Sequence, residues 1–570
     1  MKMQIRALLF LIALFSAAVL AQKSTPETRI STPSDTTKTK PPAEVKPEPK
    51  APKIELPDVL ILGKDQYHRT SSAKKELTPE SPQLFRRDET YEPLSSWFSS
   101  EDAKPQLNAG DSLALRQIWG KLRGGSYYSF YGNAGYWQKL DKGDALGSLW
   151  FDRSEGQFSN SKYAQGGLAG TLSYQAAPNA VAIVHGEYSR YLRGLQERAF
   201  SAGNAVRSIG TGQFAADLQY DINALSDGNV GIEISGLSMN SDTAGTNIDL
   251  TDNFYYDVHF DYATQIKKAQ LTTRGRYMRE TLESKQDSAS LSSSFAALGV
   301  EWLQLFSRVI TAAVGADWHL FNQDTLFSQQ RISPFARLNL TPGDQVGLSL
   351  QLSSGLKYTT LLQYWDQNGY LTHRVPLRPA EERIGLLFTG DIKITDKITF
   401  RGGYARSWMK EMFFWQADTS NGLLALNSAA DVDLVEIQIG VTAKVSEKTH
   451  VQISYIDYSD EISDNESALS PLNRLPYRAD FRMPIRASIQ LLPQLNLMLT
   501  ADIFGARKRN IRSDKTLPAY GLIHANLSAR VSENVSALLS VRNLLDAKYV
   551  VWEGYPEMGI IVTAGLSARF

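Results

Sequence analysis

The chain has 570 residues, its 60 lysines and arginines balance its 60 aspartates and glutamates, and it contains no cysteine. The zero net charge leaves no basic footprint for nucleic acid. The lack of thiols excludes disulfides, thiol catalysis and thiolate zinc sites. A mean hydropathy of −0.27 is too polar for a bundle of membrane-spanning helices.

Residues 1–21 have the pattern of a secretory signal peptide. Lys2 and Arg6 precede the apolar run Ala7–Ala21, and small residues just before Gln22 suit a cleavage site. An uncleaved membrane anchor is the alternative, although the run is short for a spanning helix. The sequence therefore predicts Sec-type export from the cytoplasm.

Residues 22–57 differ in composition from the rest of the chain. They hold 8 of the 23 prolines and no aromatic residue, with Lys, Glu, Thr and Ser in between. Such a segment cannot bury enough apolar surface to offset the entropy lost on ordering. We expect a disordered N-terminal extension that acts as a linker. Residues 58–112 follow as a short, mostly polar segment, which we expect to be periplasmic or lumenal.

From Leu113 to Phe570 the apolar residues recur with a period of two. The final stretch has an entirely apolar face, made of Ile560, Val562, Ala564, Leu566, Ala568 and Phe570. Residues 254–262, 435–445 and 495–504 alternate in the same way. Alternation over about ten residues indicates a strand with one apolar and one polar face.

Strand length and connection length separate these strands from those of a soluble sandwich. They run for about ten residues or more, whereas soluble strands average about five or six. Short turns alternate with longer loops rich in Ser, Asp, Asn and Gly. The short turns are predicted at Asp141–Asp144, Ala177–Asn179, Ser226–Asn229, Ile266–Lys268, Phe306–Arg308, Pro342–Asp344, Thr395–Lys397, Ser446–Lys448, Pro493–Gln494 and Ser532–Asn534. The pattern predicts an all-β fold, a transmembrane antiparallel up-and-down β-barrel of about 22 strands over residues 113–570.

Two stretches of the barrel region carry a family resemblance. The first comprises Val541–Tyr549, Gly554–Gly559 and the strand that ends at Phe570. The second runs from Ser354 to Glu381 and contains a leucine-arginine-proline-alanine-glutamate sequence. Both resemble TonB-dependent outer-membrane receptors. The resemblance implies a barrel of this strand number in the outer membrane of a Gram-negative cell, and uptake of a nutrient or binding of a ligand at the surface.

The sequence also departs from that family in two places. Its members carry a large plug domain before the barrel, whereas only 55 residues, 58–112, stand there in this chain. Ile560 follows Gly559 where the family has an arginine. We therefore expect a receptor-like barrel without its own full plug. The alternative is a non-energised channel, or a barrel scaffold filled by a partner protein.

A short apolar run next to the linker is the candidate for energy coupling. Asp58, Val59, Leu60, Ile61 and Leu62 resemble the box that such receptors offer to the periplasmic TonB protein. Coupling of this kind works by adding an extended segment to the edge of a partner sheet. The alternative is a short strand that packs inside the barrel.

Aromatic residues in two predicted long loops are the candidates for ligand binding. Tyr358, Tyr364, Trp365 and Tyr370 lie in one loop, and Trp408, Phe413, Phe414 and Trp415 lie in the next. Exposed loop aromatics in such number suggest a ligand or partner surface. The alternative is an outer aromatic girdle together with packing of the loops on themselves.

Nothing in the sequence points to an enzyme. The seven histidines show no metal-binding spacing, and no serine lies in a G-x-S-x-G setting. We expect no catalytic residue, no metal and no cofactor. The expected partners are outer-membrane lipid, a TonB-type periplasmic protein, a separate plug or surface protein, and the barrel assembly machinery, for which Phe570 resembles the recognition end; nucleic acid is not among them.

Overall fold

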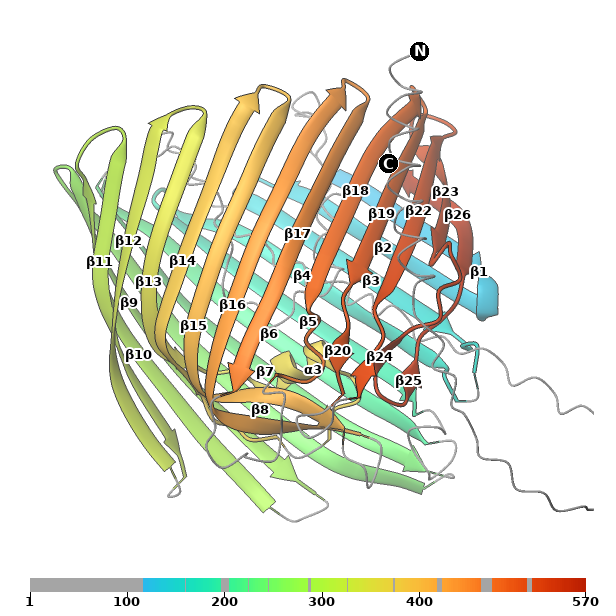
Figure 1. The fold of residues 1–570 in the computed structure, drawn as a ribbon, viewed down its shortest axis with the longest axis horizontal. Coiled ribbons are helices and arrows are strands. Elements are labelled where there is room, and N and C mark those ends of the chain that lie inside the picture. Colours follow the sequence, from blue (N-terminus) through green and yellow to red (C-terminus); the bar gives the residue numbers. More distant parts are fainter. Residues whose placement is uncertain are drawn as a thin grey trace, which may run out of the picture.

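The structure is a computed structural model that describes residues 116–570 except 159, 196–204, 224, 244–245, 286–288, 325–326, 373–374, 418–422, 463–473 and 510–514. It contains one sheet of 22 antiparallel strands. The sheet closes because β1 (Arg116–Gly125) pairs with both β2 (Ser129–Leu140) and β26 (Ile561–Arg569). The predicted up-and-down barrel is confirmed (Figure 1).

Each wall strand pairs with its neighbours in the chain, so the barrel is a continuous meander. The other wall strands are β3 (Gly143–Ser154), β4 (Tyr163–Ala177), β5 (Ala180–Gly194), β6 (Val206–Asn223), β7 (Ser226–Thr243), β8 (Thr246–Ile266), β9 (Ala269–Ser284), β10 (Ala289–Leu305), β11 (Ile310–Gln323), β12 (Phe327–Gly343), β13 (Val346–Lys357), β14 (Ala380–Thr395), β15 (Ile398–Ala417), β16 (Leu424–Ser446), β17 (Thr449–Ile462), β18 (Phe481–Leu492), β19 (Leu495–Phe504), β22 (Tyr520–Arg530) and β23 (Val535–Arg542). The remaining described elements are the 3-10 turn η1 (Ser126–Tyr128), helix α3 (Leu361–Gln367), and two small sheets, β20 (Arg507–Lys508) with β21 (Thr516–Leu517) and β24 (Val550–Trp552) with β25 (Tyr555–Pro556).

The alternation of the strands places apolar side chains outside. On β26 Leu566 is 56% exposed, and on β16 Ile439 is 56% exposed. Phe570 is 67% exposed, and its backbone exchanges two hydrogen bonds of 2.8 Å with Ile118 of β1. An apolar outer band over a fully paired backbone is what a lipid bilayer requires of a barrel.

Ten connections of two to four residues lie at one rim, here called the short-turn rim (Figure 1). The opposite rim, here called the long-loop rim, carries all the long connections, such as the one between β13 and β14, together with some short ones, such as η1 between β1 and β2. Nine of the predicted short turns coincide with these connections. The turn predicted at Ser226–Asn229 is wrong, because the chain reverses between Asn223 and Ser226. The side chain of Asn223 accepts the Leu225 N–H at 2.8 Å and so begins the turn earlier.

Charged residues on the inner wall pair with one another across a glycine on the strand between them. Asp217 of β6 reaches His259 of β8 at 3.1 Å across Gly231. Arg274 of β9 bonds Asp317 of β11 at 2.8 Å across Gly299. Because glycine has no side chain, residues two strands apart can meet.

The signal peptide 1–21, the linker 22–57 and the segment 58–112 lie outside the described residues. No helix in the described part of the chain is long and apolar enough to cross a membrane.

Candidate functional site

The connection between β13 and β14 is here called the inner segment (residues 358–379). Its described residues, 358–372 and 375–379, fold into the mouth of the barrel at the long-loop rim (Figure 1). It contains the short helix α3, which a capping box begins. The Thr360 hydroxyl accepts the Gln363 N–H at 3.3 Å, and the Gln363 side chain accepts the Thr360 N–H at 2.9 Å. The box satisfies backbone donors that a helix start would otherwise leave unpaired.

The inner segment covers an apolar patch on the inner face of the wall. The wall side of this cluster is Ile209, Leu237, Met239, Leu250, Leu282 and Leu426, and the segment side is Leu361, Leu362, Tyr364, Trp365, Leu371, Val375 and Leu377. Inward positions of a water-filled barrel are polar, so an apolar patch there requires a cover. Burial of each such leucine side chain stabilises the covered state by roughly 1.5–3 kcal/mol relative to leaving the side chain exposed.

A buried carboxylate anchors the start of the inner segment. Glu280 of β9 is 1% exposed. Its oxygens accept the Tyr358 hydroxyl at 2.6 Å, the Leu361 N–H at 2.8 Å and the Asn253 amide at 2.9 Å. Three donors compensate the carboxylate for its loss of water. Glu280 was not singled out from the sequence, because its partners lie far away in the chain.

The predicted ligand aromatics form a packed network. Tyr364 meets Phe413 and Trp415 edge-on at ring distances of 6.4 and 6.1 Å, and Trp365 meets Tyr191 at 6.2 Å. Tyr364, Trp365 and Tyr370 are 4%, 6% and 2% exposed. Their burial favours the alternative in which the loops pack on themselves. Their contact with a ligand stays a prediction.

The placement of the second aromatic group in a loop is wrong. Trp408, Phe413, Phe414 and Trp415 all lie in β15, which continues for 20 residues from Ile398 to Ala417. Phe414 is buried in a cluster with Met409. The strand extends this far because β16 continues beside it, pairing Trp415 with Leu426.

The connection between β23 and β26 (residues 543–560), here called the C-terminal loop, packs against the inner segment. Tyr555 of β25 stacks on Tyr370 with ring centroids 3.7 Å apart. Arg507 donates to the carbonyl oxygens of Val551 and Val550 at 3.1 and 2.5 Å. Trp552 then packs edge-on against Trp415 at 6.0 Å. The inner segment, β15 and the C-terminal loop thus form one aromatic body.

The C-terminal motif that carries the family resemblance has a structural basis. Asn543 and Asp546 have positive φ angles of 49° and 50°, which asparagine and aspartate tolerate better than most residues. The Asn543 amide donates to the carbonyls of Ala547 and Met558, both at 2.9 Å. Asp546 accepts the Ile560 N–H at 3.0 Å. These two side chains set the path of the loop into β26.

Burial shifts the titration of tyrosines in the mouth. It raises the pKa of Tyr364 and of Tyr370 far above the ordinary value, because the phenolate would lose its water. It raises the pKa of Tyr477 to about 12, against the pull of Arg509 and Arg507. All three hydroxyls are therefore neutral at physiological pH.

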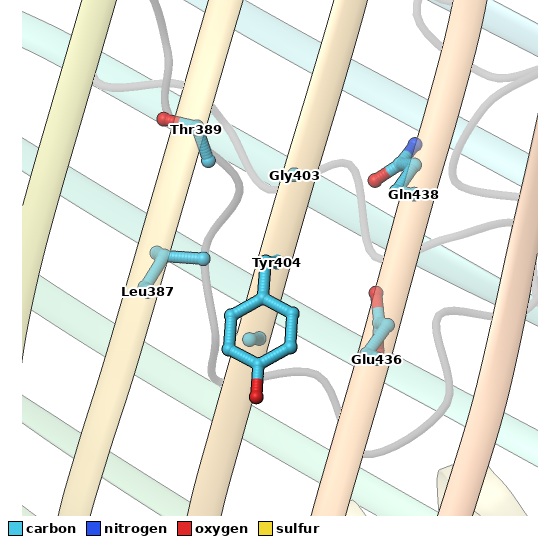
Figure 2. Close-up of a pocket in the computed structure, with 7 residues that line it drawn as sticks. Leu387, Thr389, Gly403, Tyr404, Glu436 and Gln438 are labelled. Carbon is cyan, nitrogen blue, oxygen red and sulfur yellow. The ribbon is translucent and has the colours of Figure 1, made fainter.

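A small hollow lies in the wall between β14, β15 and β16 (Figure 2). Thr389, Gly403, Glu436 and Gln438 line it, and its volume is about 30 Å³. A space of that size holds on the order of one water molecule. It is too small to hold a nutrient.

The remaining predictions concern the energy-coupling run, the assembly signal and metal binding. Asp58, Val59, Leu60, Ile61 and Leu62 lie outside the described residues. Phe570 lies at the barrel seam, where β26 meets β1. No group of three or more metal-ligating side chains occurs in the described ranges of the chain.

Comparison with known proteins places the fold. No family model matches the chain, and no curated protein matches it in sequence. Among solved structures, the siderophore receptor PiuA from Acinetobacter baumannii is similar over 80% of this chain and 82% of its own, with a TM-score of 0.64 and 10% identity. The copper transporter OprC covers 80% of both chains, with a TM-score of 0.63 and 10% identity. The ferric-catecholate import receptor Fiu from K12 E. coli covers 80% of this chain and 81% of its own, also with a TM-score of 0.63 and 10% identity.

These neighbours share the architecture and very little sequence. At 10% identity the similarity establishes the fold and leaves the ligand open. The chain therefore has the 22-strand barrel fold of TonB-dependent outer-membrane receptors.

Proposed function

We propose that this chain is an outer-membrane barrel of the TonB-dependent receptor type. It takes up a nutrient too large for simple porins, or binds such a ligand at the cell surface. The observation that supports this most is the closed 22-strand wall with its mouth occupied by the inner segment. A barrel this wide becomes a large pore unless something fills it, and a filled mouth suits selective binding better than free diffusion.

The proposal includes an orientation and an export route. Short turns lie on the periplasmic side of outer-membrane barrels and long loops on the outside, so the inner segment belongs at the cell surface. The signal-peptide pattern of residues 1–21 directs Sec-type export. Phe570, next to the seam, serves as the recognition end for the barrel assembly machinery.

Energy coupling would act through Asp58–Leu62, whose backbone would add to the sheet edge of a TonB-type protein. Proline removes a backbone donor and restricts φ, so it is poorly tolerated inside an added strand. Leu60→Pro should abolish capture of the full-length protein by a purified TonB-type periplasmic domain. Ala43→Pro, in the proline-rich linker, is the matched control and should bind normally.

A non-energised barrel, filled by a separate plug or surface protein, is the second candidate. Ile560 favours it, since it follows Gly559 where the receptor family has an arginine. Co-purification from native outer membranes tests it by finding or not finding a stoichiometric partner. A large, steady conductance of the purified chain in planar bilayers would count against the receptor proposal and for a channel.

A further inference from the structure

Two arginines face each other beneath the inner segment. Arg193 of β5 and Arg207 of β6 are directly opposed in the ladder between these strands. Residues in that relation have their Cβ atoms roughly 4.5–5.5 Å apart, and like charges so placed repel each other. Such a pair is costly unless a counter-charge lies near it.

In the described part of the chain, the direct contacts of both arginines are with uncharged groups. Arg207 is 2% exposed, and its guanidinium donates to the Leu371 carbonyl at 2.5 Å. Its Nε has no hydrogen-bond partner. The Arg193 guanidinium lies 5.2 Å from the centre of the Tyr370 ring. Among the described residues, neither guanidinium forms an ion pair with a carboxylate.

The neighbouring inner-segment groups add donors. The Asn368 amide nitrogen is buried and has no hydrogen-bond partner. The buried Tyr370 hydroxyl faces the Arg193 guanidinium, which can only donate, so the hydroxyl proton has no acceptor. The Asn368 side-chain oxygen is already occupied by the Tyr370 N–H at 2.9 Å. Glu557 is close enough to Tyr370 to act on it electrostatically. The cluster is rich in donors and short of acceptors.

The inner segment leaves room for the Arg193 guanidinium. A Cβ atom added at Gly369 would lie 2.4 Å from its Nη1, so a larger residue would displace it. Arg193 is only partly buried, whereas Arg207 is buried behind it, so the Arg193 guanidinium is the member of the pair that can be reached from the long-loop rim. The planar fork of a guanidinium matches two oxygens of a carboxylate or phosphate.

We propose that Arg193, Arg207, Asn368 and Tyr370 form a binding site for an oxyanion, either a carboxylate or a phosphate group. The anion neutralises the two opposed guanidinium groups and accepts from the unpartnered donors beneath the inner segment. The proposal concerns binding alone and holds whether or not uptake is energised.

Calorimetric titration of the purified full-length protein in detergent tests the site, with inorganic phosphate and citrate as separate probes. Ionic strength is held constant with chloride, so that general screening does not change. Saturable binding of at least one probe is expected. Binding of phosphate alone identifies a phosphate site, and binding of citrate alone identifies a carboxylate site. Binding of neither at millimolar concentration overturns the proposal.

Variants locate the site. Arg193→Gln should weaken binding at least tenfold. Arg190→Gln is the matched control, because Arg190 lies on the same strand, is exposed, and donates to Ser208 at 3.3 Å. Gly369→Ala keeps both charges while displacing Arg193, and should also weaken binding. Retained heat-modifiable migration shows that each variant still forms the barrel. Equal loss in Arg190→Gln and Arg193→Gln would show general charge attraction and refute the site.

Discussion

The wall and the inner segment are held by contacts of different range. In the wall, each strand bonds to strands next to it in the chain, except at the seam where β26 meets β1. In the inner segment, Leu361 bonds Glu280, which is 81 residues away, and Leu371 bonds Arg207, which is 164 residues away. A repeated local pattern builds the first region, and single distant partners position the second. Changes to either region should therefore have separable effects.

Removal of the inner segment should have the largest effect. Replacing residues 360–378 with a short Gly-Ser linker uncovers the apolar patch and opens the mouth. We expect single-channel conductance in planar bilayers to rise severalfold, while heat-modifiable migration shows an intact wall. An unchanged conductance would mean that the inner segment does not close the barrel, and loss of the barrel would mean that the two regions are not separable.

A substitution in the wall should instead lower the stability of the barrel. A Cβ atom at Gly299 would lie 2.0 Å from the Asp317 carboxylate and 2.8 Å from Arg274 Nε. Gly299→Val should break this ion pair and destabilise the barrel by about 1–3 kcal/mol, measured by urea unfolding in detergent. Gly347→Val is the control, since nothing lies within 4 Å of that position. Equal stability of the two variants would show that pairing across glycine is unimportant.

Weakening the anchor should affect only the mouth. Glu280→Gln removes the charge that accepts three donors, and should loosen the inner segment by about 1.5–3 kcal/mol. We expect faster limited proteolysis within residues 358–379 and an unchanged unfolding midpoint for the wall. Glu283→Gln, on the same strand but exposed, should leave proteolysis as in the native chain. Equal proteolysis of the two variants would remove Glu280 as the anchor.

Alkaline pH should produce the smallest effect. The pKa of Tyr477 is about 12, above the ordinary value of 10.0. An opened mouth therefore releases this proton at a lower pH than the packed one. The stabilisation that the protonated Tyr477 hydroxyl gives to the packed mouth is complete below pH 10 and falls as the pH rises toward 12. Tryptophan fluorescence should report opening of the mouth at a higher pH in Tyr477→Phe than in the native chain, and an identical transition would contradict this.

The features of the seam were predictable from the sequence. The period of two predicted both faces of β26 and the outward position of Phe570, which is 67% exposed. The number of short turns predicted the number of strands. These predictions succeed because strand faces and tight turns depend on residues within a few positions of each other.

The positions of the aromatic residues were not predictable from the sequence. Trp408 to Trp415 were predicted in a loop, yet they continue β15, because the partner strand β16 extends beside them. Tyr364 and Trp365 were predicted as exposed candidates for ligand contact, yet they are buried against Phe413, Trp415 and Tyr191. Residue type alone does not reveal whether an aromatic ring in a long connection faces solvent or folds inward.

By itself, the sequence determined the class of fold, the strand number and the side of each strand that meets lipid, because each follows from local alternation and turn spacing. Only the tertiary structure decided that the β13–β14 connection enters the mouth, that Glu280 holds it, and that Arg193 and Arg207 lie opposed beneath it. These arrangements arise when barrel closure brings distant strands and loops into one enclosed space, where burial and hydrogen-bond pairing select the contacts.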